Sequence, residues 1–171
     1  MTPAQIILGI VLVQRIVELL VARHNTERLL AQGAVELGAS HYPYIVLLHA
    51  AWFAALAIAV PANAAVSVPW LTVFIVLQLG RIWVIRTLGR YWTTRVISLP
   101  GAPLVRHGPY RYVRHPNYLI VAGEIAVLPL VFGEWAIALV FSILNALVLR
   151  ERIAVEERAL MARDKITPLG N

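Results

Sequence analysis

The stretch VSVPWLTVFIVLQLGRIWVIRTL, residues 66–88, is the clearest indication of the fold class, because it carries no charged side chain before Arg81. A helix needs about 20 residues to cross the hydrocarbon core of a bilayer, and this stretch is that long. The composition of the whole chain agrees, since 60% of the 171 residues are hydrophobic and only 14% are charged. This composition predicts a membrane protein and argues against disorder or a nucleic-acid-binding tail. The sequence has no cysteine, which excludes disulfides, thiolate catalysis and cysteine-ligated metal sites.

The chain contains five apolar segments, at residues 3–22, 43–60, 66–88, 118–132 and 135–150. The last two are short for a crossing, and only Gly133 and Glu134 separate them, so we expect a short helical hairpin. Pro129 should bend the first arm of this hairpin. The sequence therefore predicts an all-α, multi-pass integral membrane protein with about five transmembrane helices. We expect a single domain, residues 1–171, in which 1–88 hold three transmembrane helices and 89–171 hold a polar loop, the hairpin and a C-terminal helix.

Arginines alternate between the linkers that join these segments. Two follow the first segment and six lie between Arg86 and Arg114, whereas residues 61–65 and 133–134 contain none. Positive charge marks the cytoplasmic side of a membrane protein. We therefore expect an outside N-terminus, with loops 23–42 and 89–117 and the C-terminal tail in the cytoplasm of a cell-membrane protein.

The longest polar motif is residues 100–118, PGAPLVRHGPYRYVRHPNY, which interleaves arginine, histidine and tyrosine with stiff proline turns. Arginine offers a planar fork for a carboxylate, histidine a donor or acceptor near neutral pH, and tyrosine a flat face for a base. The motif is typical of a binding site. It is equally typical of a basic juxtamembrane loop that binds anionic lipid headgroups, and composition does not separate the two.

A second polar motif, RERIAVEERAL, occupies residues 150–160. Arg152 and Glu156 are four residues apart and therefore share one face of a helix. Taken alone, the motif reads as a solvated, salt-bridged helix. Both motifs are predicted on the cytoplasmic side, however, and the short hairpin ties their ends together, so they can form one polar pocket.

Charged side chains inside apolar segments need partners, because burying an unpaired charge in a bilayer is costly. Arg15 and Glu18, three residues apart, are expected to pair. His49 is expected to be a hydrogen-bonded packing residue. Arg81 either extends toward the interface or forms an inward-facing anion site. Glu124 has no cation on its own helix and should face an arginine of a neighbouring helix.

Three stretches carry a family resemblance: GPYRYVRHPNY before the hairpin, RIAVEERAL after it, and GRIWVIRTLGRYWTTRV ahead of both. Together they resemble the isoprenylcysteine carboxyl methyltransferase family of integral-membrane, S-adenosylmethionine-dependent O-methyltransferases. The N-terminal stretches QRIVELLVARHN and HYPYIV are similar to the short bacterial members thought to methylate alkylpyrone-type polyketides.

The resemblance implies a set of cofactor-binding residues at the mouth of the hairpin. They are Tyr110, Arg114, His115, Pro116, Tyr118, Arg152 and Glu156. Glu156 could hold the ribose hydroxyls or the ammonium of S-adenosylmethionine, or it could act on the substrate as a catalytic residue. Arg81 matches the catalytic arginine thought to orient the acceptor oxygen. His107 stands where a small polar residue is common, which leaves its role open.

The resemblance further implies a lipophilic acceptor with a carboxylate or acidic hydroxyl, contact with membrane lipid, no metal and no nucleic-acid partner. Two alternatives remain from the sequence. One is an NADPH-dependent membrane reductase of the sterol type, for which the chain is short. The other is a non-catalytic membrane protein that binds anionic lipid. The sequence contains no G-x-G-x-x-G, P-loop or H-E-x-x-H motif, so a nucleotide-type cofactor must be held in some other way.

Overall fold

The computed structural model describes residues 1–166, with side chains through residue 158. Residues 167–171 of the predicted domain, and the Arg163 and Lys165 side chains, lie outside this described part. The chain is mostly helical. Its long helices are α1 (Pro3–Ala31), α2 (Tyr42–Ala59), α3 (Val68–Leu88), α4 (Pro116–Val131) and α5 (Trp135–Ile166).

Local sequence explains where these helices begin and end. Thr2 caps α1 in a capping box with Gln5, which satisfies backbone N–H groups that the first turn leaves free. Each of α2, α3 and α4 has a proline in its first turn, where proline is tolerated because no helical N–H is needed. Helix α1 runs on to Ala31, well past the predicted end at residue 22, because no glycine or proline lies between residue 22 and Gly33.

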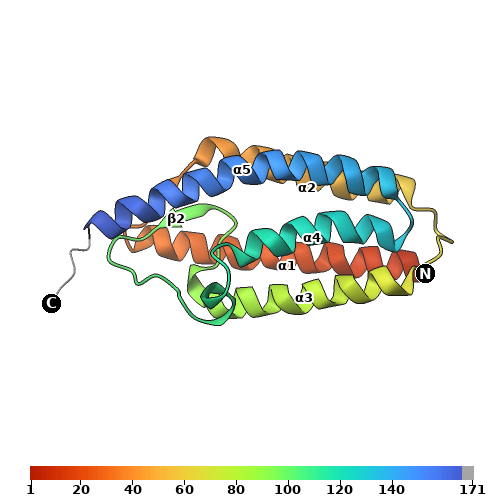
Figure 1. Ribbon diagram of the computed structural model, residues 1–171, viewed down its shortest axis with the longest axis horizontal. Coiled ribbons are helices and arrows are strands. Elements are labelled where there is room, and N and C mark those ends of the chain that lie inside the picture. The colour runs from red at the N-terminus through yellow and green to blue at the C-terminus, as the bar shows by residue number, and fades with distance from the viewer. Residues whose placement is uncertain (167–171) are drawn as a thin grey trace.

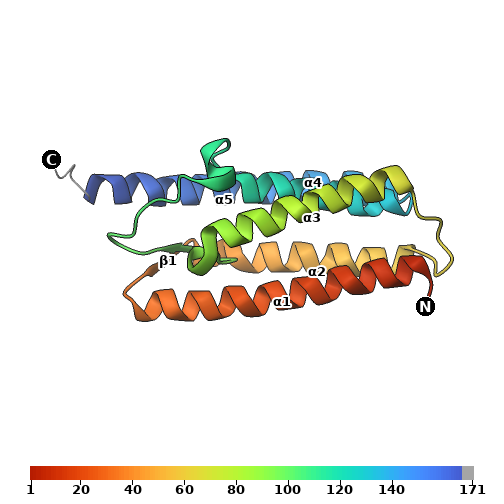
Figure 2. The ribbon, with the colours of Figure 1, turned by 90° about the horizontal axis from the view of Figure 1, so that it is seen from below.

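The five helices run side by side along the long axis of the molecule (Figures 1 and 2). The N-terminus, the α2–α3 linker and the α4–α5 turn lie at one end. The α1–α2 connection, the long loop between α3 and α4, and the C-terminal part of α5 lie at the other end (Figure 1). The arginine-poor connections and the arginine-rich ones thus occupy opposite ends of the bundle, as the alternation predicts.

The core lies where α4 packs between its neighbours. Ile125, Leu128 and Val131 on α4 are at most 1% exposed and pack with Trp52 of α2 and Phe74 of α3. The outer faces of the other helices instead expose large apolar side chains, among them Ile10, Leu47, Leu79 and Leu139. A face of this kind suits lipid rather than water.

By length and composition, three helical stretches can span a membrane: Pro3–Ala31, Ala39–Ala59 and Val68–Tyr91. Helix α4 is apolar but shorter, as the sequence predicts for the first arm of the hairpin. The chain is therefore a multi-pass membrane protein with three such spans among its described residues, where the sequence predicts about five.

Two features depart from the prediction. Strands β1 (Val35–Leu37) and β2 (Val96–Ser98) pair antiparallel and add a small sheet to a chain predicted to be all-α. Three-residue strands are too short to show the alternating pattern that predicts a strand. In addition, the second hairpin arm and the predicted C-terminal helix form one continuous helix, α5, because no proline or glycine separates them.

Candidate cofactor-binding site

The two polar motifs meet where the first turn of α4 faces α5. The Tyr118 hydroxyl donates a hydrogen bond to Glu156, and Arg152 Nε donates to the same hydroxyl oxygen at 2.9 Å. The Arg152 guanidinium also lies over the Tyr118 ring, 5.5 Å from its centroid. A tyrosine from one motif is thus held between an arginine and a carboxylate of the other.

His115 immediately precedes α4 and completes the group. Its ring stacks on that of Tyr118, with centroids 5.5 Å apart and planes 20° from parallel. Its Nδ1 lies 3.8 Å from Glu156 Oε1, and its Nε2 lies 3.6 Å from Glu157 Oε1. We call His115, Tyr118, Arg152 and Glu156 the end cluster. Glu157, which follows Glu156 on α5, borders this cluster.

The loop after α3 and the start of α2 also support the end cluster. Arg152 Nη2 donates to the Thr94 carbonyl oxygen at 2.7 Å, and the Thr94 hydroxyl lies 3.1 Å from the Tyr42 hydroxyl. Sequence reasoning missed Thr94 and Tyr42. The stretch around Tyr42 resembled short bacterial members of the family, but nothing in its pattern indicated a contact with the loop.

Tyr110 lies in the 3-10 turn η3 (Gly108–Arg111) and is half-buried. Burial raises its pKa, and the negative charge of Glu156 raises it further, so the hydroxyl stays protonated and can donate a hydrogen bond. Gly108 allows this turn to form: its φ is +59°, and a Cβ there would lie 2.6 Å from Thr87 Oγ1. The loop therefore approaches α3 only with glycine at this position.

Pro116 and Arg114 are the remaining predicted residues of the site. Pro116 is buried and begins α4 directly after His115. Arg114 is exposed, and no hydrogen bond or ion pair joins it to the end cluster among the described residues. The structure thus brings together His115, Pro116, Tyr118, Arg152 and Glu156 and leaves Arg114 at the rim.

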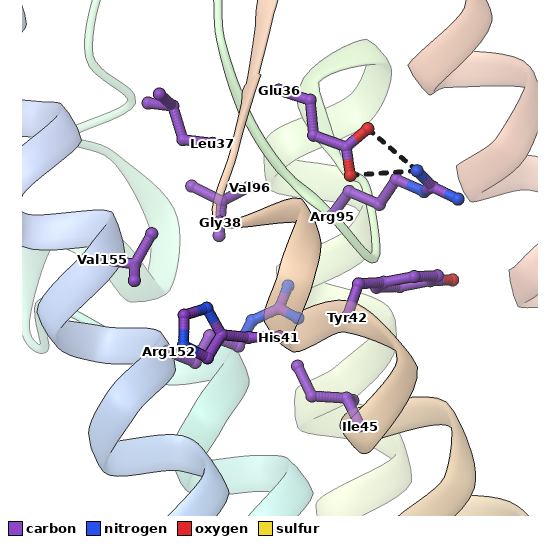
Figure 3. Close-up of a pocket in the computed structure, with 10 residues that line it drawn as sticks. All are labelled: Glu36, Leu37, Gly38, His41, Tyr42, Ile45, Arg95, Val96, Arg152 and Val155. Carbon is purple, nitrogen blue, oxygen red and sulfur yellow. Dashed lines mark hydrogen bonds and ion pairs between the residues drawn. The ribbon is translucent and has the colours of Figure 1, made fainter.

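A recess adjoins the end cluster, with Arg152 in its lining (Figure 3). Arg95, on the same recess, pairs with Glu36 at 2.8 Å and lies over the Tyr42 ring, 4.5 Å from its centroid. Helix α5 closes the recess at Val155. The recess thus brings Arg95 and Tyr42 next to the end cluster.

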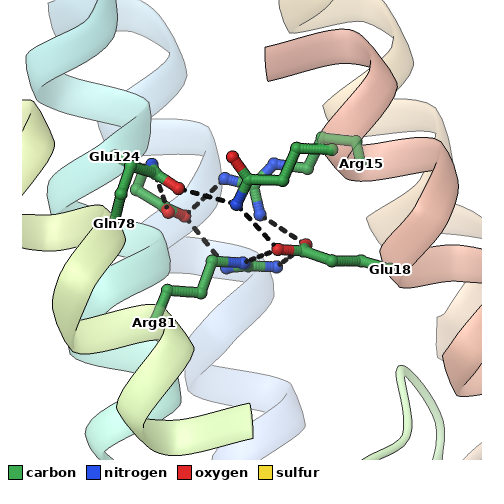
Figure 4. Close-up of polar contacts among 6 residues, drawn as sticks. Arg15, Glu18, Gln78, Arg81 and Glu124 are labelled. Carbon is green, nitrogen blue, oxygen red and sulfur yellow. Dashed lines mark hydrogen bonds and ion pairs between the residues drawn. The ribbon is translucent and has the colours of Figure 1, made fainter. Parts of the chain in front are cut away.

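A second polar group lies deeper between the helices (Figure 4). Arg15 pairs with Glu18 at 2.9 Å, and Arg15 and Arg81 both pair with Glu124, at 2.8 and 3.0 Å. The predictions for Arg15, Glu18 and Glu124 are thereby confirmed. His49, as predicted, is hydrogen-bonded within its helix, with Nδ1 2.8 Å from the Ile45 carbonyl oxygen.

Arg81 does not extend toward the interface, since it is only 7% exposed. Its Nε and Nη2 donate to the two oxygens of Glu18 at 2.7 and 2.6 Å, and its Nη1 donates to Glu124. Glu124 lies six residues after Tyr118 on α4, which is about 9 Å along the helix axis. The predicted orienting arginine is thus engaged by carboxylates, at a distance from the end cluster.

The fold and this site define a multi-pass membrane protein with a polar binding cluster at one end of its bundle. Residues 70–162 match the sequence pattern of the isoprenylcysteine carboxyl methyltransferase (ICMT) family. The chain is also 40% identical over 159 residues to the uncharacterized protein YpbQ of Bacillus subtilis (strain 168), covering 91% of this chain and 95% of that protein. No solved structure gives a significant match. The chain belongs to the ICMT family, a family of membrane methyltransferases that use S-adenosylmethionine as the methyl donor.

The end cluster suits this methyl donor chemically. Carboxylates can accept from an ammonium or from hydroxyls, a stacked His115–Tyr118 pair offers an aromatic face, and arginine can meet a carboxylate. The side-chain oxygen of Asn117, between these two aromatic residues in sequence, is buried and has no hydrogen-bond partner among the described residues. Buried polar atoms are normally paired, so this oxygen is an unsatisfied acceptor in the segment that carries His115 and Tyr118.

Proposed function

We propose that this protein transfers a methyl group from S-adenosylmethionine to an oxygen of a lipophilic acceptor. The acceptor class is a carboxylate or acidic hydroxyl on an apolar tail, as in an alkylpyrone-type polyketide or a prenylcysteine-like molecule. The observation that carries the proposal is the meeting of both family motifs in the end cluster, through the Tyr118 hydroxyl, Arg152 and Glu156.

In this proposal the cofactor contacts are Tyr110, Arg114, His115, Pro116, Tyr118, Arg152 and Glu156. His115 and Tyr118 present their ring faces to the adenine or to the amino-acid part. An arginine meets the carboxylate, and the exposed Arg114 is free to move to it. Glu156 accepts from the ribose hydroxyls or the ammonium, or alternatively contacts the acceptor.

Bound S-adenosylmethionine supplies a methyl group on a positively charged sulfur, so transfer to an acceptor oxygen leaves a neutral thioether. The protein's task is then to align the acceptor oxygen and to exclude water. A carboxylate or an acidic hydroxyl is already ionised or readily ionised, so no strong general base is required. Arg95 and Arg152 line the recess beside the end cluster and can attract an acidic acceptor there.

The acceptor's apolar tail would lie among the lipid-exposed side chains of α2 and α5. These two helices pack closely against each other, and residues of both line the recess. The active site would face the cytoplasm, where the methyl donor is made. The support for this orientation is the gathering of arginine-rich loops at the end of the bundle that holds the site.

Equilibrium binding to purified protein in detergent tests the proposal. S-adenosylmethionine should bind, and NADPH should not, which separates the methyltransferase from a sterol-type reductase. A non-catalytic lipid-binding protein would bind neither. His115→Ala and Glu156→Ala should each weaken binding of S-adenosylmethionine, while Arg158→Ala, an exposed change on the same helix, should not. Native affinity in both of the first two variants would place the site elsewhere.

A further inference from the structure

The buried ion pairs around Arg81 form a closed group that links three helices. Arg15 and Glu18 belong to α1, Arg81 to α3 and Glu124 to α4, so two positive and two negative charges balance. Gln14 bridges Glu18 and Gln78 at 2.9 and 2.7 Å, and Gln78 donates to Glu124 at 2.8 Å. We call these six residues the charge clasp (Figure 4).

The centre of the clasp is buried, because Glu18, Arg81 and Glu124 are 8%, 7% and 2% exposed, while the Arg15 side chain at its edge is 17% exposed. Each carboxylate oxygen accepts at least one of these bonds. A buried ion pair tolerates the interior only while each charge keeps its partner. Loss of one charged member therefore leaves a net charge between membrane helices, whereas loss of one positive and one negative member together does not.

The clasp also joins α1 to α3 and α4, two helices that α1 approaches less closely than they approach each other. Helix α3 packs closely along α4, and α4 along α5, whereas α1 makes its main close backbone contact with the 3-10 turn η2 (Gly89–Tyr91). The α3–α4 contact is tight near the clasp, since a Cβ on Gly123 would lie 2.9 Å from the Leu77 side chain. The N-terminal half of α1 packs against these helices through Val11 of the apolar core, and one turn further along, the long side chains of the clasp add polar contacts from α1 to both α3 and α4.

Helix α4 carries both the clasp and the end cluster. Tyr118 and His115 lie six and nine residues before Glu124, about 9 and 13 Å along the axis. A helix behaves as a rigid rod over this length, so a shift or rotation at Glu124 moves Tyr118 relative to Arg152 and Glu156 on α5. Fixing Glu124 fixes the geometry of the end cluster.

We propose that Arg81 and Glu124 are positioning residues, which set the depth and rotation of α4 through the charge clasp and thereby hold Tyr118 and His115 against α5. Arg81 then acts through Glu124 and does not itself contact the acceptor. The inference rests on the proposed function in treating Tyr118 and His115 as cofactor contacts.

Charge balance gives a sharp test. Glu124→Gln keeps the shape of the side chain but leaves the clasp with one excess positive charge. Arg15→Gln/Glu124→Gln removes one charge of each sign and keeps the bidentate Arg81–Glu18 pair. Glu134→Gln is the matched control, because it makes the same change in the turn between α4 and α5, at a residue with no ion pair among the described side chains.

Two quantities are measured for each variant in lipid nanodiscs. The first is S-adenosylmethionine affinity. The second is the distance distribution between spin labels at Leu20→Cys on α1 and Leu119→Cys on α4, two exposed positions in a chain without native cysteine. The distance needs no ligand, so it judges the clasp even if the wild-type protein binds no S-adenosylmethionine, an outcome that would refute only the proposed function.

We expect Glu124→Gln to shift or broaden the distance distribution and to weaken affinity about tenfold or more, as for coupled buried charges. The double variant should restore the parent distance distribution and bring the affinity to within about threefold of the parent value. Glu134→Gln should give the parent distance and the parent affinity. If Glu124→Gln does not fold, a folded double variant with the parent distance supports the clasp equally. Native distance and affinity in Glu124→Gln would overturn the proposal. So would equal impairment of the single and double variants, since the Glu124 carboxylate itself would then be what matters.

Discussion

The Tyr118 hydroxyl donates to Glu156 while accepting from Arg152 Nε at 2.9 Å. This single hydroxyl joins α4 to α5 at the point where the two family motifs meet. Its removal is therefore a direct probe of the site.

Tyr118→Phe should weaken S-adenosylmethionine binding about tenfold, because Arg152 and Glu156 both lose a partner while the ring stays in place. Isothermal titration calorimetry measures the effect. Tyr112→Phe is the control, since Tyr112 is 75% exposed in the same loop and should bind normally. Equal affinity in the two variants would show that the hydroxyl has no part in the site.

Arg152→Lys should also impair the site, although it keeps the positive charge. One ammonium cannot reproduce the two directed contacts that Arg152 makes, to the Tyr118 hydroxyl and to the Thr94 carbonyl at 2.7 Å. We expect about a tenfold loss of S-adenosylmethionine affinity. Arg158→Lys on the same helix should have no such effect, and an equally functional Arg152→Lys would mean that only charge is needed.

The sequence predicted the apolar segments, the polar motifs and the partners of Arg15, Glu18 and Glu124, because length, charge cost and helical spacing are local or nearly local properties. It did not predict strands β1 and β2, whose pairing depends on distant residues, nor the Thr94 contact with Arg152. Arg81 shows the limit most clearly. Its position in the segment was equally consistent with an interfacial arginine and with an inward one, and only the approach of α1 and α4 decides between them.

Arg81→Lys separates a positioning role from direct contact with the acceptor. Lysine keeps the charge balance of the clasp but loses the bidentate fork on Glu18, so we expect only a several-fold loss in both S-adenosylmethionine affinity and single-turnover rate. Arg81→Gln should be far more damaging, because it leaves a net negative charge. A loss on the order of a hundredfold in rate, at native cofactor affinity, would instead indicate that Arg81 orients the acceptor directly.

The orientation in the membrane is predicted from the arginine-rich connections. Reporter fusions after Ala65 and after Arg95 should lie on opposite sides of the membrane, with the second in the cytoplasm. These two positions lie in connections at opposite ends of the bundle (Figure 1). Reporters on the same side would contradict the predicted topology.

The most direct test of the proposed methyl transfer is a single-turnover assay with S-adenosylmethionine labelled in its methyl group. Purified protein in nanodiscs is mixed with a long-chain alkylpyrone or a prenylcysteine analogue, and label in the lipid-soluble product is followed with time. We predict transfer to an acceptor oxygen by the wild-type protein, and a loss on the order of a hundredfold in rate for Glu156→Gln. Binding of S-adenosylmethionine without transfer to either acceptor class, or transfer that is unchanged in Glu156→Gln, would contradict it.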